Sequence, residues 1–185
     1  KGFRVATNQN DVLHRLFSCG EYSLSTVSPS LAPSMDIQVA SNFERLLYYV
    51  LDGNNEKLRE IMKIFASNGK YSFENFSVDR FSSSSVTDSE IPDIIKDVQD
   101  KYNYTVDPHT ACGFKDLKPA DNYLVMATAH PAKFPSVYEK AGMDFPRSEI
   151  LETLKSKEII KYHTGTGVKE IKKIICEKIG TSIPV

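Results

Sequence analysis

The sequence predicts an α/β fold that is rich in helix and contains part of an open, mostly parallel sheet flanked by helices. Two short apolar stretches, 3–7 and 122–127, are typical of buried strands. Longer stretches carry apolar residues three and four positions apart, which is the spacing of an amphipathic helix. Because the expected helices outnumber the expected strands, we expect this chain to supply only part of the sheet.

The first part of the chain is expected to contain a strand, a turn and helices. The strand at 3–7 is followed at 8–11 by Asn and Asp residues, which favour a turn because their side chains bond the local backbone. Apolar residues spaced for one face predict helices over 12–17 and 55–67. The stretch 20–33 is rich in Ser and Pro and has no period, which indicates a functional or mobile loop.

Capping residues mark the start of further helices. Ser41 and Glu44 have the spacing of a capping box, in which two side chains satisfy the free N–H groups of the first turn. Ser89 is a plausible cap, and Asp107 followed by Pro108 is typical of a cap and a first helical residue. These three signals predict helices over 42–52, 90–102 and 108–118, respectively.

The rest of the chain alternates irregular stretches with helices. Residues 73–81 look extended or irregular, and the four serines at 82–85 are a candidate flexible linker. The strand at 122–127 leads into a helix that a proline opens. We expect this helix and two later ones over 131–141, 147–156 and 168–179.

Composition excludes several classes of function. The chain has 185 residues, a formal net charge of −1 and no basic stripe, so nucleic acid is not expected as a partner. No apolar run approaches the roughly 20 residues needed to cross a bilayer, so no membrane partner is expected. Cys19, Cys112 and Cys176 lack the spacing of a metal site, which favours reduced thiols in a cytoplasmic protein without a bound metal. Because the chain enters its first strand directly after Lys1 and Gly2, we expect it to be a fragment.

Four motifs in a fixed order carry the most specific signal. They are Val5 to Asp11, Met35-Asp36-Ile37 with Ser41 to Arg45, Asp107 to Ala111, and Thr128 to Phe134. Together they resemble the C-terminal portion of threonine synthases, which are pyridoxal 5'-phosphate (PLP) enzymes of the tryptophan-synthase-β type, also called fold type II. The resemblance implies that 1–145 is the C-terminal part of the large PLP-binding domain, with a helical insertion around 53–105. Residues 146–185 would then form a helical C-terminal tail.

Thr128 is the leading candidate for a cofactor-binding residue. It stands where the apolar run 124–127 meets a helix, and ligands of open α/β sheets bind at this end of the strands. The resemblance implies that its hydroxyl bonds the pyridine nitrogen of PLP. A neutral hydroxyl does not keep that nitrogen protonated as a carboxylate would, so the cofactor would be a more restrained electron sink.

Six further residues are candidates for the substrate site. Three lie just past the first strand, where they either line a site or only form a turn. The others surround the start of the second helix, where Arg45 could face a substrate phosphate, pair with Asp36 or form an unrelated salt bridge. The candidates are Asn8, Asn10, Asp11, Asp36, Asn42 and Arg45.

Three basic residues resemble catalytic groups but are interpreted otherwise. Phe114-Lys115-Asp116 is similar to the tripeptide that carries the Schiff-base lysine of this family, but it stands where the family has an ordinary helix surface. We therefore interpret Lys115 and Lys133 as solvated charges. His130 is interpreted as a helix-entry histidine whose ring bonds the backbone.

The resemblance implies an activity for the complete enzyme and leaves alternatives open. The complete enzyme would convert O-phospho-L-homoserine and water into L-threonine and phosphate. The Schiff-base lysine and the loop for the cofactor phosphate are expected upstream, in the missing N-terminal half, so no catalytic residue is expected here and the fragment alone should be inactive. A phospho-lyase that acts on a related phosphorylated amino acid and a non-catalytic module that keeps the fold are the alternatives.

Overall fold

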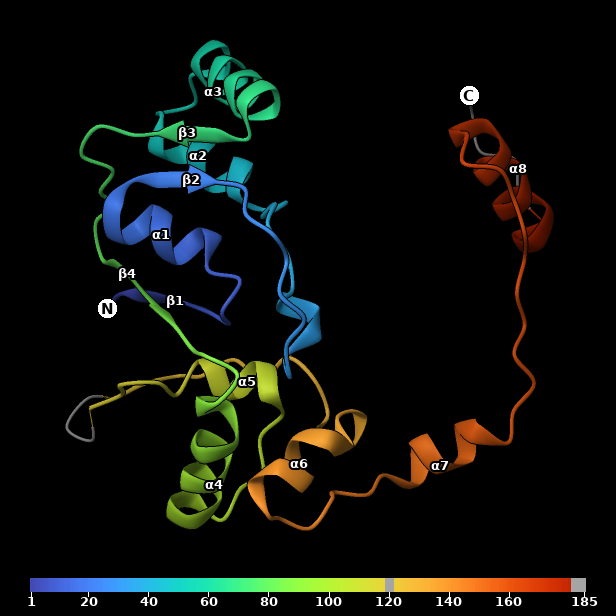
Figure 1. The fold of residues 1–185 in the computed structure, drawn as a ribbon. Coiled ribbons are helices and arrows are strands. Elements are labelled where there is room, and N and C mark those ends of the chain that lie inside the picture. The colour runs from blue at the N-terminus through green and yellow to red at the C-terminus, as the bar shows by residue number, and fades with distance from the viewer. Residues whose placement is uncertain (119–121, 181–185) are drawn as a thin grey trace. The chain divides into compact units, whose positions relative to one another are not determined.

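The computed structural model describes residues 1–118 and 122–180 as two units, which we treat separately. The first unit runs from Lys1 to Arg147, and the second begins at Ser148. The first unit combines a small parallel sheet with many helices (Figure 1), which confirms the expected α/β class. The assignment of 1–145 and 146–185 to separate domains stays a prediction.

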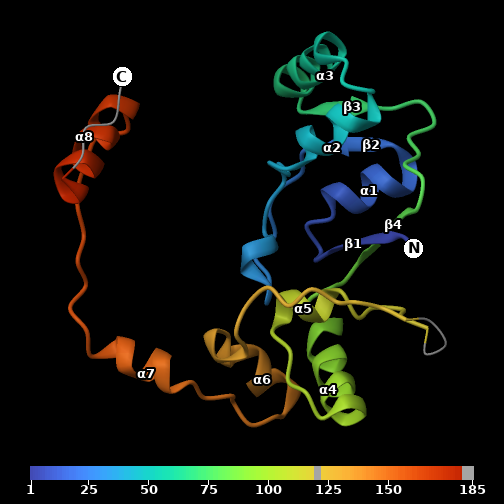
Figure 2. The same ribbon diagram turned by 180° about the vertical axis from the view of Figure 1, so that it is seen from behind.

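A parallel pair of strands lies at the centre of the first unit. Strand β1 (Phe3–Thr7) pairs with β4 (Phe81–Ser85), in a register that runs from Phe3 opposite Phe81 to Thr7 opposite Ser85. Helix α1 (Val12–Cys19) lies beside both strands, as the two opposite views in Figures 1 and 2 show. The expected strand at 3–7 is confirmed.

The serine tract was expected to be a flexible linker, and that prediction was wrong. Ser82 to Ser85 form most of β4 because β1 offers them a complete row of backbone partners. Two of their hydroxyls also form hydrogen bonds: Ser85 Oγ donates to the Asn8 carbonyl at 2.9 Å, and Ser83 Oγ bonds His14 Nδ1 at 2.9 Å. Tertiary pairing therefore outweighs a composition that is locally typical of a linker.

One hydrophobic core lies between α1 and a second small sheet. Strands β2 (Glu21–Ser23) and β3 (Lys70–Ser72) are antiparallel, and helices α2 (Phe43–Val50) and α3 (Asn55–Asn68) pack beside them. The buried side chains of this core are Val12, Leu16, Tyr22, Ala40, Phe43, Leu47, Ile61 and Phe65. The capping box expected at Ser41 does not form, because Asn42 is the N-cap of α2 and makes no capping bond with its side chain.

Helix α4 (Glu90–Tyr102) lies beside α5 (Pro108–Cys112) and α6 (Pro135–Ala141), as Figures 1 and 2 show, and a second core is formed around them. The Tyr138 hydroxyl, fully buried here, donates to the Val106 carbonyl at 2.8 Å. The other buried members of this core are Ala32, Val86, Ile91, Ile95, Val98, Ala111, Cys112 and Val137.

Three expected elements near the second core differ from the structure. The helix expected over 108–118 ends at Cys112, since Gly113 and the left-handed Asp116 (φ 55°) favour a turn. The helix expected over 131–141 is divided into η2 (Pro131–Lys133) and α6 (Pro135–Ala141). Pro135 keeps the preceding residue out of helical geometry.

The strand expected over 122–127 does not form either. The segment carries no strand assignment, and its apolar side chains Leu124 and Met126 are 88% and 71% exposed. A strand requires a hydrogen-bonded neighbour, and within the described residues the two sheets contain only β1 with β4 and β2 with β3. The segment therefore has the apolar pattern of a strand, but no strand among the described residues pairs with it.

Over its described residues, 148–180, the second unit contains the short helices α7 (Glu149–Lys155) and α8 (Val168–Ile179). Neither helix has a buried residue. Among the described residues, no helix is both long enough and apolar enough to cross a bilayer.

Candidate functional site

A cleft of about 1260 Å³ opens on the first unit. Its walls come from β1, from the 3-10 helix η1 (Pro33–Met35), from α5 and from the segment 122–129. The apolar lining includes Phe3, Ala6, Met35, Val125, Met126 and Ala129. The polar lining includes Ser34, His109, Thr110 and Thr128. A mostly apolar hollow with a few convergent polar groups is the usual form of a small-molecule site.

Thr128 lies in this cleft and is solvent-exposed. Its backbone N–H donates to the Thr110 hydroxyl at 3.2 Å. Within the described part of the chain its own hydroxyl makes no hydrogen bond, so that hydroxyl is available to a ligand. Whether this ligand is the expected cofactor stays a prediction.

Asp107 organises the wall beside Thr128. As the N-cap of α5, its Oδ1 accepts the backbone N–H of His109 at 3.0 Å, and its Oδ2 accepts the Thr110 hydroxyl. Burial by itself raises the pKa of the Asp107 carboxyl, but the hydrogen bonds from His109 and Thr110 outweigh this effect and hold that pKa below its usual range. The group is therefore an ionised, acceptor-only centre.

His109 connects α5 to η1. Its Nδ1 bonds Asp107 Oδ1 at 2.8 Å, and its Nε2 accepts the backbone N–H of Ser34 at 3.0 Å. Because Nε2 acts as an acceptor, the network assigns the proton to Nδ1 and the neutral form to the ring. The ring also packs edge-on against Phe134, with the two centroids 4.7 Å apart.

His109 and Thr110 were not among the predicted site residues. The motif Asp107 to Ala111 was recognised, and Asp107 was expected as a helix cap, but its two polar neighbours received no role. Part of this arrangement could be predicted, because an aspartate N-cap accepts hydrogen bonds from the backbone N–H groups at the second and third helical positions. In α5 these positions are His109 and Thr110. Their contacts with Ser34 and Thr128 lie far along the chain and leave no local pattern.

Asn8, Asn10 and Asp36 are brought together in one hydrogen-bonded cluster. Asp36 Oδ1 accepts from Asn8 Nδ2 at 2.7 Å and from Asn10 Nδ2 at 2.9 Å. Ser30 donates to the same carboxylate through its hydroxyl at 2.6 Å and its N–H at 2.9 Å. The predicted alternative that Asp36 pairs with Arg45 is therefore wrong, because these four bonds fix the carboxylate on the loop that leads to η1.

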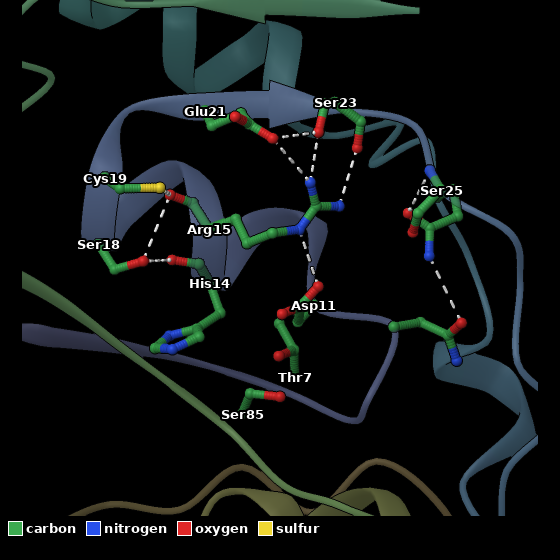
Figure 3. Close-up of polar contacts among 12 residues, drawn as sticks. Thr7, Asp11, His14, Arg15, Ser18, Cys19, Glu21, Ser23, Ser25 and Ser85 are labelled. Atoms are coloured by element: carbon green, nitrogen blue, oxygen red, sulfur yellow. Dashed lines mark hydrogen bonds and ion pairs between the residues drawn. The ribbon is translucent and has the colours of Figure 1, made fainter.

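Asp11 belongs to a different cluster, shown in Figure 3. Its Oδ1 accepts from Arg15 Nε at 2.9 Å, and the other guanidinium nitrogens bond Glu21 Oε1 at 3.4 Å and the Ser23 carbonyl at 2.9 Å. A hydrogen bond from Lys70 and another from Ser23 lower the pKa of Glu21. This cluster ties α1 to β2, and Asp11 does not line the cleft.

Asn42 and Arg45 lie at the start of α2 with exposed side chains. Neither residue lines the cleft, and Arg45 makes no ion pair within the described ranges. The structure therefore does not bring these two candidates to Thr128. Their contact with a substrate stays a prediction.

The basic residues that resemble catalytic groups are engaged or exposed. Lys115 Nζ donates to the Ser85 carbonyl at 2.7 Å and lies 2.8 Å from Glu90 Oε1, so it is a partly buried ion pair rather than a solvated charge. Lys133 is exposed. The His130 Nδ1 accepts the N–H of Ala132 at 3.1 Å, which confirms the helix-entry interpretation.

Comparison with known proteins gives one consistent result. No family model matches the chain. A threonine synthase of Pseudomonas aeruginosa is 40% identical over 148 aligned positions, which cover 75% of this chain and 32% of that protein. A threonine synthase of Saccharomyces cerevisiae is 31% identical over 210 aligned positions, which cover 95% of this chain and 41% of that protein.

Solved structures agree with the sequence comparison. The crystal structure of PLP-bound threonine synthase from Brucella melitensis has a TM-score of 0.76 at 31% identity and covers 85% of this chain and 36% of that one. The crystal structure of threonine synthase from yeast has a TM-score of 0.77 at 29% identity, and the match covers 97% of this chain and 42% of that one. The chain spans about a third to two fifths of the length of these curated relatives. In sequence and in fold, it belongs to the threonine synthase family.

Proposed function

We propose that this chain is the C-terminal portion of a threonine synthase whose complete form converts O-phospho-L-homoserine and water into L-threonine and phosphate. The proposal is supported by family membership at up to 40% identity and by the cleft that contains Thr128. The observation that carries it is the unpaired Thr128 hydroxyl in a mostly apolar hollow. The remaining two thirds of such an enzyme would lie outside this chain.

The residues of the cleft fit one end of a PLP molecule. The Thr128 hydroxyl would donate to the ring nitrogen, and the apolar side chains of Met35 and Val125 would exclude water beside the ring. When bound, PLP supplies an electron sink for chemistry at the carbon atoms of the amino acid. A neutral hydroxyl partner does not hold the ring nitrogen protonated, which keeps that sink moderate.

The asparagine cluster would shape the site without touching the substrate. Asn8, Asn10 and Asp36 use their polar atoms on one another and on Ser28 to Ala32, so few remain for a ligand. Their role in the proposal is to hold the loop that carries η1 to the cleft. Three of the six predicted substrate-site residues would therefore position this loop and would not bind the substrate.

Covalent attachment of the cofactor would come from outside this chain. A lysine that attaches PLP needs a desolvated pocket that lowers its pKa. Lys115 is held by Glu90 and Ser85, and Lys1 and Lys133 are exposed to solvent. We therefore propose that the 185-residue chain is inactive by itself.

Product analysis with O-phosphohomoserine tests the proposal. The complete protein, loaded with PLP, should release threonine and phosphate in equal amounts, and the 185-residue chain should release neither. A keto acid in place of threonine would support the phospho-lyase alternative. Absence of both PLP binding and product in the complete protein would refute the proposal in favour of a non-catalytic module.

Thr128→Val in the complete protein tests the site itself. Loss of one hydrogen bond to the ring should raise the dissociation constant of PLP by about two- to tenfold and alter its absorption spectrum. Thr153→Val is the matched control, because Thr153 donates its hydroxyl only to the Glu149 carbonyl within α7. Unchanged PLP affinity and turnover in Thr128→Val would remove this residue from the site.

A further inference from the structure

We propose that Asp107 and Thr110 are positioning residues that fix the backbone of Thr128 and so aim its hydroxyl into the cleft. This inference rests on the proposed function of Thr128 as the partner of the cofactor ring. Both residues precede Thr128 by about twenty positions and come from α5, so the link is made by the fold and not by local sequence.

The Thr110 hydroxyl has two partners that determine its orientation. It donates its single proton to Asp107 Oδ2, and it accepts the backbone N–H of Thr128 at 3.2 Å. Since an ionised carboxylate only accepts, the hydroxyl proton points to Asp107 and a lone pair is left for Thr128. Asp107 and Thr110 are 1% and 4% exposed, so water does not compete strongly for these bonds.

The segment that carries Thr128 needs such an anchor because no strand among the described residues pairs with it. Residues 122–128 belong to neither sheet, so a side chain takes the place of a backbone acceptor. Gly113, three residues after Thr110, allows a second close approach between this part of the chain and the segment 122–128. A Cβ atom at this position would lie 2.9 Å from Val125 Cγ1 and 3.2 Å from the Thr110 carbonyl oxygen.

The same carboxylate is also linked to a second wall of the cleft, which η1 forms. Through His109, Asp107 is linked to the backbone N–H of Ser34 in η1. One buried charge therefore sets the position of two of the walls that would face a ligand. A change at Thr110 should disturb the Thr128 wall selectively, because the His109 link uses the other carboxylate oxygen.

Amide hydrogen exchange on the complete protein, before PLP is added, tests the anchor without any cofactor. The Thr128 amide should be protected in the wild type and in Thr110→Ser, which keeps the hydroxyl. In Thr110→Val its exchange should be about tenfold faster, the equivalent of one lost hydrogen bond. Thr153→Val should leave the Thr128 amide unchanged. An unprotected Thr128 amide in the wild type would overturn the inference, whether or not the valine variant folds.

The nitrogen-15 chemical shift of isotope-labelled PLP in the complete protein tests the consequence for the ring. Thr110→Val should move the ring-nitrogen signal in the same direction as Thr128→Val, and Thr110→Ser should restore it. In the double variant the ring-nitrogen signal should move little further than in Thr128→Val alone, because the two changes remove the same interaction with the ring. A merely structural role for Thr110 would lower stability and leave the signal in place, which would contradict the inference. Failure of the wild type to bind PLP would instead refute the proposed function.

Discussion

At the scale of single residues, Asp36 does more for the loop beside the cleft than its half-buried position suggests. It accepts from Asn8, Asn10 and both donors of Ser30, so one carboxylate joins the turn after β1 to the loop before η1. Such bonds to a charged acceptor are stronger than bonds between neutral groups. The geometry of this wall therefore depends on a single side chain.

Asp36→Ala should lower the free energy of unfolding by about 2 kcal/mol, because several donors would lose one shared charged acceptor. Asp79→Ala is the control, since that side chain is 90% exposed and pairs only with its neighbour Arg80. Urea unfolding monitored by circular dichroism measures both variants. Equal stability of Asp36→Ala and the wild type would show that the cluster does not hold the loop.

The limits of sequence reasoning are clear from these residues. The position of Asn8 and Asn10 at the end of a strand followed from local pattern, and so did the N-cap role of Asp107. Their partners could not be predicted in the same way. Asp36 lies 28 positions from Asn8, and Thr128 lies 18 positions from Thr110, so only the folded chain reveals the contacts.

At the scale of elements, the ion pair of Glu90 and Lys115 joins three parts of the fold. Glu90 opens α4, Lys115 lies in the turn after α5, and the same lysine donates to the last carbonyl of β4. The hydrogen bond from Lys115, with others from Thr87, lowers the pKa of Glu90 to about 2. Because the folded-state pKa lies below the ordinary value, the pair stabilises the folded chain above pH 4.5.

This stabilisation should fade as the pH falls from 4.5 to about 2. Glu90→Gln should therefore flatten the loss of stability over that range, compared with the wild type. At pH 7 the variant should lose no more than about 1 kcal/mol, because the side chain is partly exposed and solvent screens the pair. Glu152→Gln, in an exposed pair with Lys155, is the control. Parallel acid titrations of the wild type and Glu90→Gln would contradict the assignment.

The elements also show why some predictions succeeded and others failed. The helices at 90–102 and 168–179 and the strand at 3–7 were predicted with their observed bounds, because their patterns are local and strong. The serine strand at 82–85 was missed because β1 determines it. The expected strand at 122–127 has the right composition but no partner strand in the described residues.

At the scale of the whole molecule, the segment 122–128, which pairs with no strand among the described residues, leaves apolar side chains in contact with water. Phe3, Leu124 and Met126 are 67%, 88% and 71% exposed, and all three line the cleft of the first unit. Soluble monomers rarely expose large contiguous apolar patches, and unpaired sheet edges recruit other chains. In a protein as long as the curated relatives, further chain would be available to cover this surface.

The isolated 185-residue chain should consequently self-associate through this surface, and association should increase with concentration by mass action. Leu124→Lys combined with Met126→Lys should shift sedimentation toward the monomer, because two charges on the patch oppose its burial. Ile159→Lys changes a side chain of similar exposure in the second unit and should leave the association unchanged. A wild-type chain that sediments as a monomer at every concentration would show that the exposed segment does not drive association. A response to Ile159→Lys alone would place the contact on the second unit instead.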